Sequence, residues 1–299
     1  MNLDGLTVDG LHRSFEEQGY ICEKNLAVTV FLALKLNKPL LVEGAPGVGK
    51  TEIAKVLSRV FDAELIRLQC YEGLDENKAL YEWNYQKQLL RIQMQKENIG
   101  YEIKERDLFS DEYLLERPLL KAIRSEKPVV LLIDEVDKVE DEFEAFLFEV
   151  LSDFQVSIPE LGTIAARQIP IVVLTSNRER ELSDGLKRRC VYLFIDYPTI
   201  EKEVRILKVK APEAGERLSR EVARAVNLIR SNKAVGKKPA ISESIDWARA
   251  LVALGAGSLS REAVMQTLNI VLKNKDDIDT VVREVGAEAL AAYAQKHEN

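Results

Sequence analysis

A glycine-rich stretch near residue 45 constrains the fold of this chain more than any other feature of its sequence. Residues 44–51, Gly-Ala-Pro-Gly-Val-Gly-Lys-Thr, match the pattern G-x-x-x-x-G-K-[ST] at every defined position. The apolar run 40–42 before it is typical of a buried strand, and apolar residues recur at helical spacing over 53–61 after it. This order of strand, loop and helix argues against a chance glycine-rich turn. It predicts a site for the phosphates of a nucleoside triphosphate.

Each residue type in this loop has a physical task. Glycines allow backbone N–H groups to turn inward around a phosphate, and the N-terminus of the following helix adds partial positive charge. We expect Lys50 to reach the outer phosphates as a point charge and Thr51 to offer its hydroxyl to Mg²⁺. The predicted nucleotide contacts in this stretch are Ala45, Pro46, Gly47, Val48, Gly49, Lys50, Thr51 and Glu52.

A pair of carboxylates follows the most apolar run of the chain. Residues 129–133, Val-Val-Leu-Leu-Ile, predict a central buried strand, and Asp134 and Glu135 come directly after it. Behind a complete P-loop, the first carboxylate at such a strand end helps to hold Mg²⁺ and the second activates water. We therefore predict Thr51 and Asp134 as metal-binding residues and Glu135 as a catalytic residue. An ordinary helix N-cap is the alternative for Asp134.

The composition narrows the class of protein. The chain has 299 residues, of which 46% are hydrophobic and 30% charged, which suits a globular protein with a large core. A formal net charge of −7 provides no global basic field for nucleic acid or an anionic membrane. Three widely spaced cysteines indicate reduced thiols, and no segment has the pattern of a signal peptide or a membrane span. We therefore expect a cytoplasmic protein without membrane contact.

The order of the predicted elements indicates the fold class. Strand-like runs alternate with helical patterns as far as residue 195, and only helical patterns follow. This order predicts an α/β P-loop NTPase domain over 1–197, with a parallel sheet flanked by helices, and an all-helical lid domain over 198–299. The five predicted strands cover 40–42, 63–70, 129–133, 169–174 and 190–195.

Several local features lie outside this regular order. Residues 72–112 combine many charges and aromatic side chains with weak periodicity, which indicates an insertion. Local packing is the favoured role for those aromatic side chains, and a surface for a partner is the alternative. Two short alternating runs around a turn predict a hairpin over about 155–166. Two of the predicted helices cover 114–125 and 278–295.

The complete set of motifs resembles the AAA+ ATPases over nearly the whole chain. Within them the chain looks like the MoxR branch, and most like its CoxD-type members. The phrases that carry this resemblance are RLQCYEGLDENKALYEWNY, LLIDEVDK, FEAFLFEVLSDFQVSIPELGT, VVLTSNRERELSDGLKRRC and SIDWARAL. They are long, and therefore more specific than the P-loop alone.

The resemblance implies roles for further residues. Asn177 looks like the sensor 1 residue, between the terminal phosphate of ATP and the attacking water. Arg188 or Arg189 resembles the arginine finger that reaches the nucleotide of a neighbouring subunit. Tyr20 and Ile21 match the segment that the family brings over the adenine base.

The lid side departs from the family. Its usual sensor 2 arginine aligns with Ser242, so Arg249 is the predicted lid contact to the nucleotide, and Lys237 or Lys238 is the alternative.

The resemblance also implies an oligomer, commonly a hexameric ring, that uses ATP and Mg²⁺. MoxR-type ATPases often act with a von Willebrand factor A-domain partner, and CoxD-type members assist metal-cofactor insertion into a client enzyme. A remodelling chaperone that hydrolyses ATP is therefore the favoured function. A nucleic-acid motor or loader is an alternative, against which the acidic balance argues. A nucleotide-gated scaffold with little turnover is another, against which the intact Asp134-Glu135 pair argues, and a small-molecule kinase is a weaker one.

Overall fold

The computed structural model describes residues 5–96 and 108–296, and these fall into two compact units. The first unit holds the described parts of 5–14, 23–43 and 51–194, and the second holds 15–22, 44–50 and 195–296. The short second-unit segments are therefore inserted in the sequence of the first. One of them, 44–50, is most of the glycine-rich loop. The boundary predicted at 197/198 divides the chain at a single position, whereas these units are discontinuous in sequence, and it remains a prediction.

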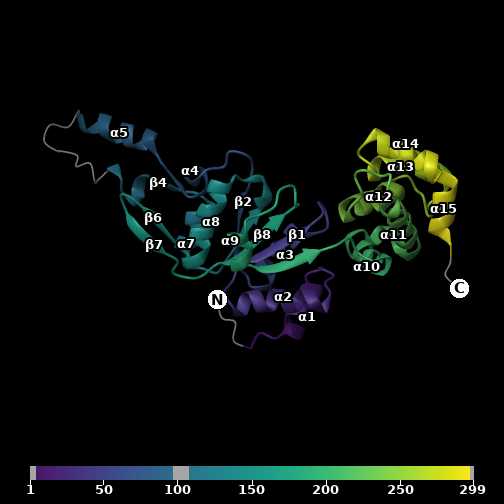
Figure 1. The fold of residues 1–299 in the computed structure, drawn as a ribbon, viewed down its shortest axis with the longest axis horizontal. Helices are drawn as coiled ribbons and strands as arrows, with labels where there is room; N and C mark the ends of the chain where they lie inside the picture. Colours follow the sequence, from purple (N-terminus) through teal and green to yellow (C-terminus); the bar gives the residue numbers. More distant parts are fainter. Residues whose placement is uncertain (1–4, 97–107, 297–299) are drawn as a thin grey trace. The chain divides into compact units, whose positions relative to one another are not determined.

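Five strands form one sheet in the spatial order β2-β5-β8-β1-β9. Three of them, β2, β8 and β1, are labelled in Figure 1. β1 pairs with β8, β8 with β5 and β5 with β2, in each case in parallel. The prediction of a parallel sheet flanked by helices is thus confirmed. The strand bounds are β1 (Leu40–Gly44), β2 (Glu64–Gln69), β5 (Val129–Asp134), β8 (Ile171–Ser176) and β9 (Val191–Ile195).

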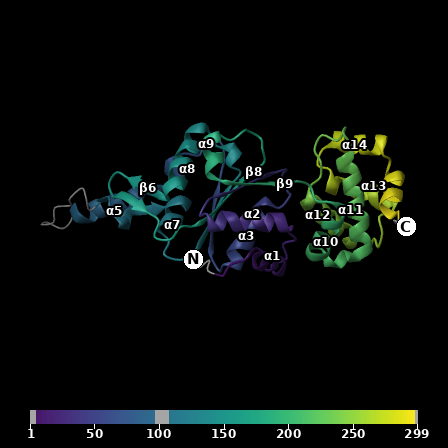
Figure 2. The same ribbon diagram turned by 60° about the horizontal axis from the view of Figure 1, so that its bottom comes forward.

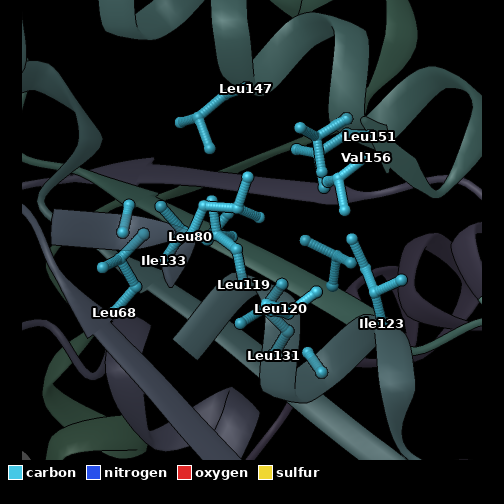
Figure 3. Packing of buried hydrophobic residues seen from close by; sticks show 14 of the residues in the cluster. Leu68, Leu80, Leu119, Leu120, Ile123, Leu131, Ile133, Leu147, Leu151 and Val156 are labelled. Carbon is cyan, nitrogen blue, oxygen red and sulfur yellow. The ribbon is translucent and has the colours of Figure 1, made fainter. Parts of the chain in front are cut away.

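Helices cover both faces of this sheet. On one face α7 (Pro118–Arg124) and α8 (Asp141–Asp153) bury leucines and isoleucines against β2 and β5 (Figure 3). Side chains of α2 (Lys24–Lys35) and α3 (Lys50–Val60) lie beside Leu40 on the other. Because every residue of β5 is buried, its apolar run is explained by helices on both sides. The carboxyl edge of the sheet remains available for polar side chains.

The predicted insertion has structure of its own at both ends. It contains α4 (Glu76–Ala79), β3 (Tyr81–Trp83), α5 (Tyr85–Lys96) and the 3-10 turn η1 (Asp111–Tyr113), and its residues 97–107 lie outside the described part. The Trp83 ring is buried, with edge-on contacts to Tyr81 and Phe109, so local packing explains part of its aromatic content. Tyr85 is instead 60% exposed, together with Leu89, Leu90 and Met94 of α5.

The predicted helix over 114–125 is wrong in its first third. Residues Leu114–Glu116 form strand β4, which pairs antiparallel with β3. Helix α7 begins only at Pro118, where proline occupies the first turn. Proline disfavours helical backbone in the residue before it, so Arg117 is extended and separates the strand from the helix.

The hairpin predicted over 155–166 is confirmed. Strands β6 (Gln155–Ile158) and β7 (Gly162–Ala165) pair antiparallel after α8. Helix α1 (Val8–Glu17) precedes α2, the 3-10 turn η2 (Val136–Lys138) follows β5, and α9 (Asp184–Arg189) precedes β9.

Every described element after β9 is helical, as predicted (Figure 2). Trp247 is fully buried in the core of these helices. The predicted last helix, 278–295, is wrong, because the chain divides there into two helices. Gly286 has a φ of +79°, a left-handed value that glycine adopts readily and that ends a helix. The bounds are α10 (Ile200–Lys210), η3 (Pro212–Ala214), α11 (Gly215–Ser231), α12 (Ile241–Ala253), α13 (Arg261–Val271), α14 (Lys275–Glu284) and α15 (Ala287–Gln295).

A buried ion pair crosses this helical core. Arg230 donates to both carboxylate oxygens of Glu203, at 2.6 and 2.8 Å, and to the carbonyl of Pro239. The side chains of Arg230 and Glu203 are 5% and 0% exposed. This pair joins α10 to α11 and to the chain that leads into α12.

Among the residues that the structure describes, no helix combines the length and hydropathy that a membrane span requires.

Candidate functional site

The glycine-rich loop connects β1 to α3. Gly47 and Gly49 have φ values of +75° and +95°, which residues with a side chain rarely adopt. Lys50 is 6% exposed, and its Nζ donates to the carbonyls of Gly44 and Ala45, at 2.8 Å each. The loop therefore has the left-handed turns of a phosphate cradle, and its lysine lies against that cradle.

Thr51 and Asp134 are brought together by α3 and β5. The Thr51 hydroxyl donates to Asp134 Oδ1 at 3.1 Å, and the hydroxyl of Thr175 donates to the same oxygen at 2.5 Å. Asp134 is only 4% exposed. A buried carboxylate beside two hydroxyls offers the hard oxygen atoms that Mg²⁺ prefers, so this donor set fits that ion. The other oxygen, Oδ2, accepts a bond from Arg67 at 2.5 Å.

Glu135 occupies an unusual backbone conformation. Its φ and ψ are 59° and 48°, the left-handed region in which a residue with a Cβ atom is strained. The Thr175 hydroxyl holds this conformation by accepting the Glu135 N–H at 2.9 Å. The carboxylate lies 2.6 Å from Lys138 Nζ and accepts a bond from Gln69 at 3.1 Å. Strain of this kind is concentrated at functional positions.

Asn177 directly follows β8, the strand next to β5 in the sheet. The carboxyl ends of parallel neighbours meet at one edge, so Asn177 and Glu135 belong to the same edge of the first unit. The N–H of Asn177 donates to Asp137 at 3.0 Å. This edge thus carries the predicted metal-binding carboxylate, catalytic carboxylate and amide.

The two candidate finger residues end α9 and differ in their surroundings. Arg189 lies over the Phe148 ring, with its guanidinium carbon 3.3 Å from the ring centroid, and also donates to Ser152. Arg188 is exposed, and within residues 5–96 and 108–296 its side chain makes no hydrogen bond or ion pair. Arg188 is therefore the arginine available to another molecule.

Three predicted residues, Tyr20, Ile21 and Arg249, belong to the second unit. Tyr20 contacts Phe15 edge-on, and both Tyr20 and Ile21 are half-buried. Arg249 donates to the carbonyl of Lys210 at 2.6 Å and lies 3.6 Å from Glu213, so its guanidinium is engaged at the end of α10.

Ser242, by contrast, lies against the glycine-rich loop. A Cβ atom added to Gly47 would stand 2.6 Å from the Ser242 hydroxyl. Within this unit the first turn of α12 therefore contacts the loop at the position predicted to align with sensor 2.

Arg67, Gln69 and Thr175 were not predicted from the sequence. Arg67 and Gln69 alternate with buried Ile66 and Leu68 along β2, so they share the other face of that strand. In the pairing of β2 with β5, Gln69 lies opposite Asp134. This register brings Arg67 to Asp134 and Gln69 to Glu135. Alternation was visible in the sequence, but the pairing of β2 with β5 was not.

Two uncharacterised proteins are similar to this chain in sequence. Over 242 residues the chain is 26% identical to an uncharacterised protein of Staphylococcus aureus strain USA300, which covers 77% of this chain and 83% of that protein. A second uncharacterised protein, from the bovine strain RF122 of the same species, is 27% identical over 58% of this chain and 63% of its own length.

Among solved structures, the RuvB Holliday junction branch migration motor of Thermotoga maritima has a TM-score of 0.50 and 18% identity. The match covers 88% of this chain and 76% of RuvB, and at this identity it shows the fold alone. The family model described as an AAA domain of the dynein-related subfamily matches residues 39–190, which is about half of the chain. The matched stretch contains the glycine-rich loop, both acidic residues and Asn177. The chain therefore belongs to the AAA family, in its dynein-related subfamily.

Proposed function

We propose that this chain binds and hydrolyses ATP with Mg²⁺. The observation that carries the proposal is the meeting of Thr51, Thr175 and Asp134 in one hydrogen-bonded group, with Glu135 held next to it in a strained conformation. Lys50 directly precedes Thr51, so the phosphate loop and this group are covalently adjacent. A structural N-cap role for Asp134 would require neither the second hydroxyl nor the strain.

Each residue has one task in this proposal. The loop N–H groups and Lys50 bind the phosphates, and the Thr51 hydroxyl and Asp134 hold the metal. Mg²⁺, when bound, neutralises charge on the phosphate oxygens. Glu135 orients and polarises the attacking water, and Asn177 holds that water in line. Positioning and charge stabilisation account for most of the catalysis of phosphoryl transfer, so these groups suffice on one side of the nucleotide.

In this proposal a neighbouring subunit supplies the arginine whose positive charge stabilises the transition state. We assign it to Arg188, because Arg189 is engaged by Phe148 and Ser152 of its own chain. An arginine that acts on another subunit requires an oligomer, and we propose a hexameric ring by resemblance to MoxR-type ATPases. Turnover per chain should therefore rise with protein concentration as the ring assembles.

The client function follows from the same resemblance. We propose a MoxR-type chaperone of the CoxD-like branch that remodels a metalloenzyme client in the cytosol, together with a von Willebrand factor A-domain protein. The hairpin β6–β7 and the insertion support this assignment, because both are additions to the central sheet. In this proposal a client or partner contacts them, for example at the exposed side chains of α5. Purification of the Glu135→Gln chain from the native host, with bound ATP, should retain the client.

The decisive test is the Glu135→Gln substitution. The amide keeps the shape of the side chain but cannot polarise water, so we expect binding of a fluorescent ATP analogue to persist while phosphate release stops. Glu288→Gln, which changes an exposed carboxylate on α15, is the matched control and should hydrolyse ATP normally. Normal phosphate release by Glu135→Gln would refute the proposed role.

A further inference from the structure

The segment between β8 and α9, residues 177–183, has no helix or strand but is fixed at both ends. It begins with Asn177, the proposed water-positioning amide, and leads into α9, which carries Arg188. Two buried carboxylates hold its backbone, and both come from the stretch of chain just after Glu135. The segment thus connects a residue of one active site to a residue proposed to act in the neighbouring one.

Asp137 holds the first end of the segment. Its Oδ2 accepts the N–H of Asn177 at 3.0 Å and the N–H of Glu179 at 2.8 Å, and the residue is 3% exposed. Arg178, between them, has a φ of +64°, which turns both N–H groups toward one oxygen. The backbone at Asn177 therefore cannot rotate without breaking a charge-assisted bond inside the protein.

Glu144 of α8 holds the other end. Both of its carboxylate oxygens lie 3.1 Å from the N–H of Ser183, and the residue is 1% exposed. Ser183 in turn caps α9, because its hydroxyl accepts the N–H of Leu186. The start of the short helix that carries Arg188 is thus attached to α8.

Arg180, in the middle of the segment, binds the same stretch of chain that follows Glu135. Its guanidinium lies 2.9 Å from Asp141 and 3.7 Å from Glu144, and it donates to the carbonyl of Val139 at 2.8 Å. Among the described residues, Asp137 Oδ1 and Arg180 Nε are buried side-chain atoms without a partner. Unsatisfied buried polar atoms are costly, and a segment needed only for stability would not concentrate them.

We propose that Asp137, Glu144 and Arg180 form a brace that positions residues of two active sites at once. Asp137 orients Asn177 toward the nucleotide of its own subunit. Glu144, with Arg180, sets the position of α9 and so of Arg188, which acts on the nucleotide of the next subunit. The brace residues are positioning residues, and this role rests on the proposed ATP hydrolysis in a ring.

Amide hydrogen exchange tests the brace without reference to activity. In the wild-type chain the N–H groups of residues 177, 179 and 183 should exchange slowly although they lie in a loop. Asp137→Ala should release 177 and 179 and leave 183 protected, and Glu144→Ala should do the reverse. Asp137→Asn and Glu144→Gln retain an acceptor oxygen and should keep most of the protection. Loss of protection along the whole chain would mark an alanine variant as misfolded, and the amide variants would then carry the test: slightly faster exchange confined to 177 and 179 in Asp137→Asn, and to 183 in Glu144→Gln, would support the brace. Unchanged protection of these N–H groups in a folded alanine variant would overturn it.

Turnover in mixed rings tests the division of tasks. Both alanine variants should bind a fluorescent ATP analogue normally, with kcat lowered by up to about 100-fold because the reacting groups are misplaced. Glu135→Gln subunits cannot hydrolyse ATP but keep their own Arg188. Adding them in excess should restore turnover per Glu144→Ala subunit and should not restore it for Asp137→Ala.

The two experiments separate failure of this inference from failure of the proposed function. Equal behaviour of the two alanine variants in mixed rings, or unchanged kcat in both, would overturn the brace. A wild-type chain that binds ATP but never releases phosphate would overturn the proposed function, and the exchange pattern would still report whether the brace contacts exist.

Discussion

Arg67 should compete with the metal for Asp134. Its guanidinium bonds Asp134 Oδ2 at 2.5 Å, and a metal held through the same carboxylate would be repelled by that positive charge. Replacing Arg67 with Gln should therefore lower the Mg²⁺ concentration needed for tight binding of a fluorescent ATP analogue. Arg67→Lys, which keeps the charge, should change it less.

The magnitude follows from the exposure of the pair. A fully exposed ion pair contributes about 0.2–1 kcal/mol, and a hydrogen bond to a charged group about 1.5–3 kcal/mol. The Arg67 side chain is 53% exposed and that of Asp134 only 5%, so an intermediate value of about 1 kcal/mol is appropriate. This energy corresponds to a shift of about fivefold in the Mg²⁺ midpoint.

The assay is a Mg²⁺ titration of nucleotide fluorescence at fixed chain and nucleotide concentrations. Arg283→Gln, which changes an exposed arginine on α14 with a side chain 70% exposed, is the control and should leave the midpoint unchanged. A midpoint that stays constant or rises in Arg67→Gln would refute the competition. A rise would mean that Arg67 assists nucleotide binding in place of opposing the metal.

Three further predictions concern other parts of the molecule. Arg188→Ala should lower phosphate release by a factor of about 1,000 or more, as loss of an arginine finger does, whereas Arg189→Ala should mainly lower the melting temperature, by removing the Phe148 contact. Arg230→Ala should destabilise the second unit by about 3–5 kcal/mol, because Glu203 is left buried and unpaired. Urea unfolding, followed by Trp247 fluorescence in a Trp83→Phe background, measures this free energy. A loss below about 1 kcal/mol would contradict the prediction. Burial raises the pKa of Cys70 and Cys190 to about 12 and that of Cys22 to about 11, so at pH 8 the folded chain should react with a thiol reagent about 100-fold more slowly than the urea-unfolded chain. Since these values exceed the unfolded value of 9.0, the thiols' contribution to stability is complete below pH 9 and is lost as the pH rises through the folded values, which melting temperatures across this range would reveal.

The sheet was predictable because its strands are short apolar runs between polar turns. The errors arose where local pattern and context disagreed. Residues 114–116 have a composition that suits helix or strand, and only pairing with Tyr81–Trp83 made them a strand. Gly286 lies inside an otherwise helical pattern, and its left-handed backbone divides the helix. The strand depends on pairing that local propensity does not show, whereas the glycine is a local signal for the end of a helix that the sequence analysis did not use.

The candidate site was predictable to the extent that it is written in contiguous motifs. The loop residues, Asp134 and Glu135 follow one another along the chain, so spacing alone identifies them. Arg67 and Thr175 reach Asp134 only through strand register, and the distinction between Arg188 and Arg189 depends on the aromatic ring beneath one of them. Asp137 is part of the quoted phrase LLIDEVDK, but its partners lie 40 and 42 positions away.

The left-handed backbone of Glu135 lowers the stability of the fold at the position of the proposed catalytic carboxylate. An L-residue there costs roughly 1–2 kcal/mol that glycine would not incur, so selection for thermal stability alone would favour glycine at this position. A stabilised variant with glycine at residue 135 would lack the carboxylate that we propose to be catalytic, so residue 135 should be checked before such a variant is used in a turnover assay.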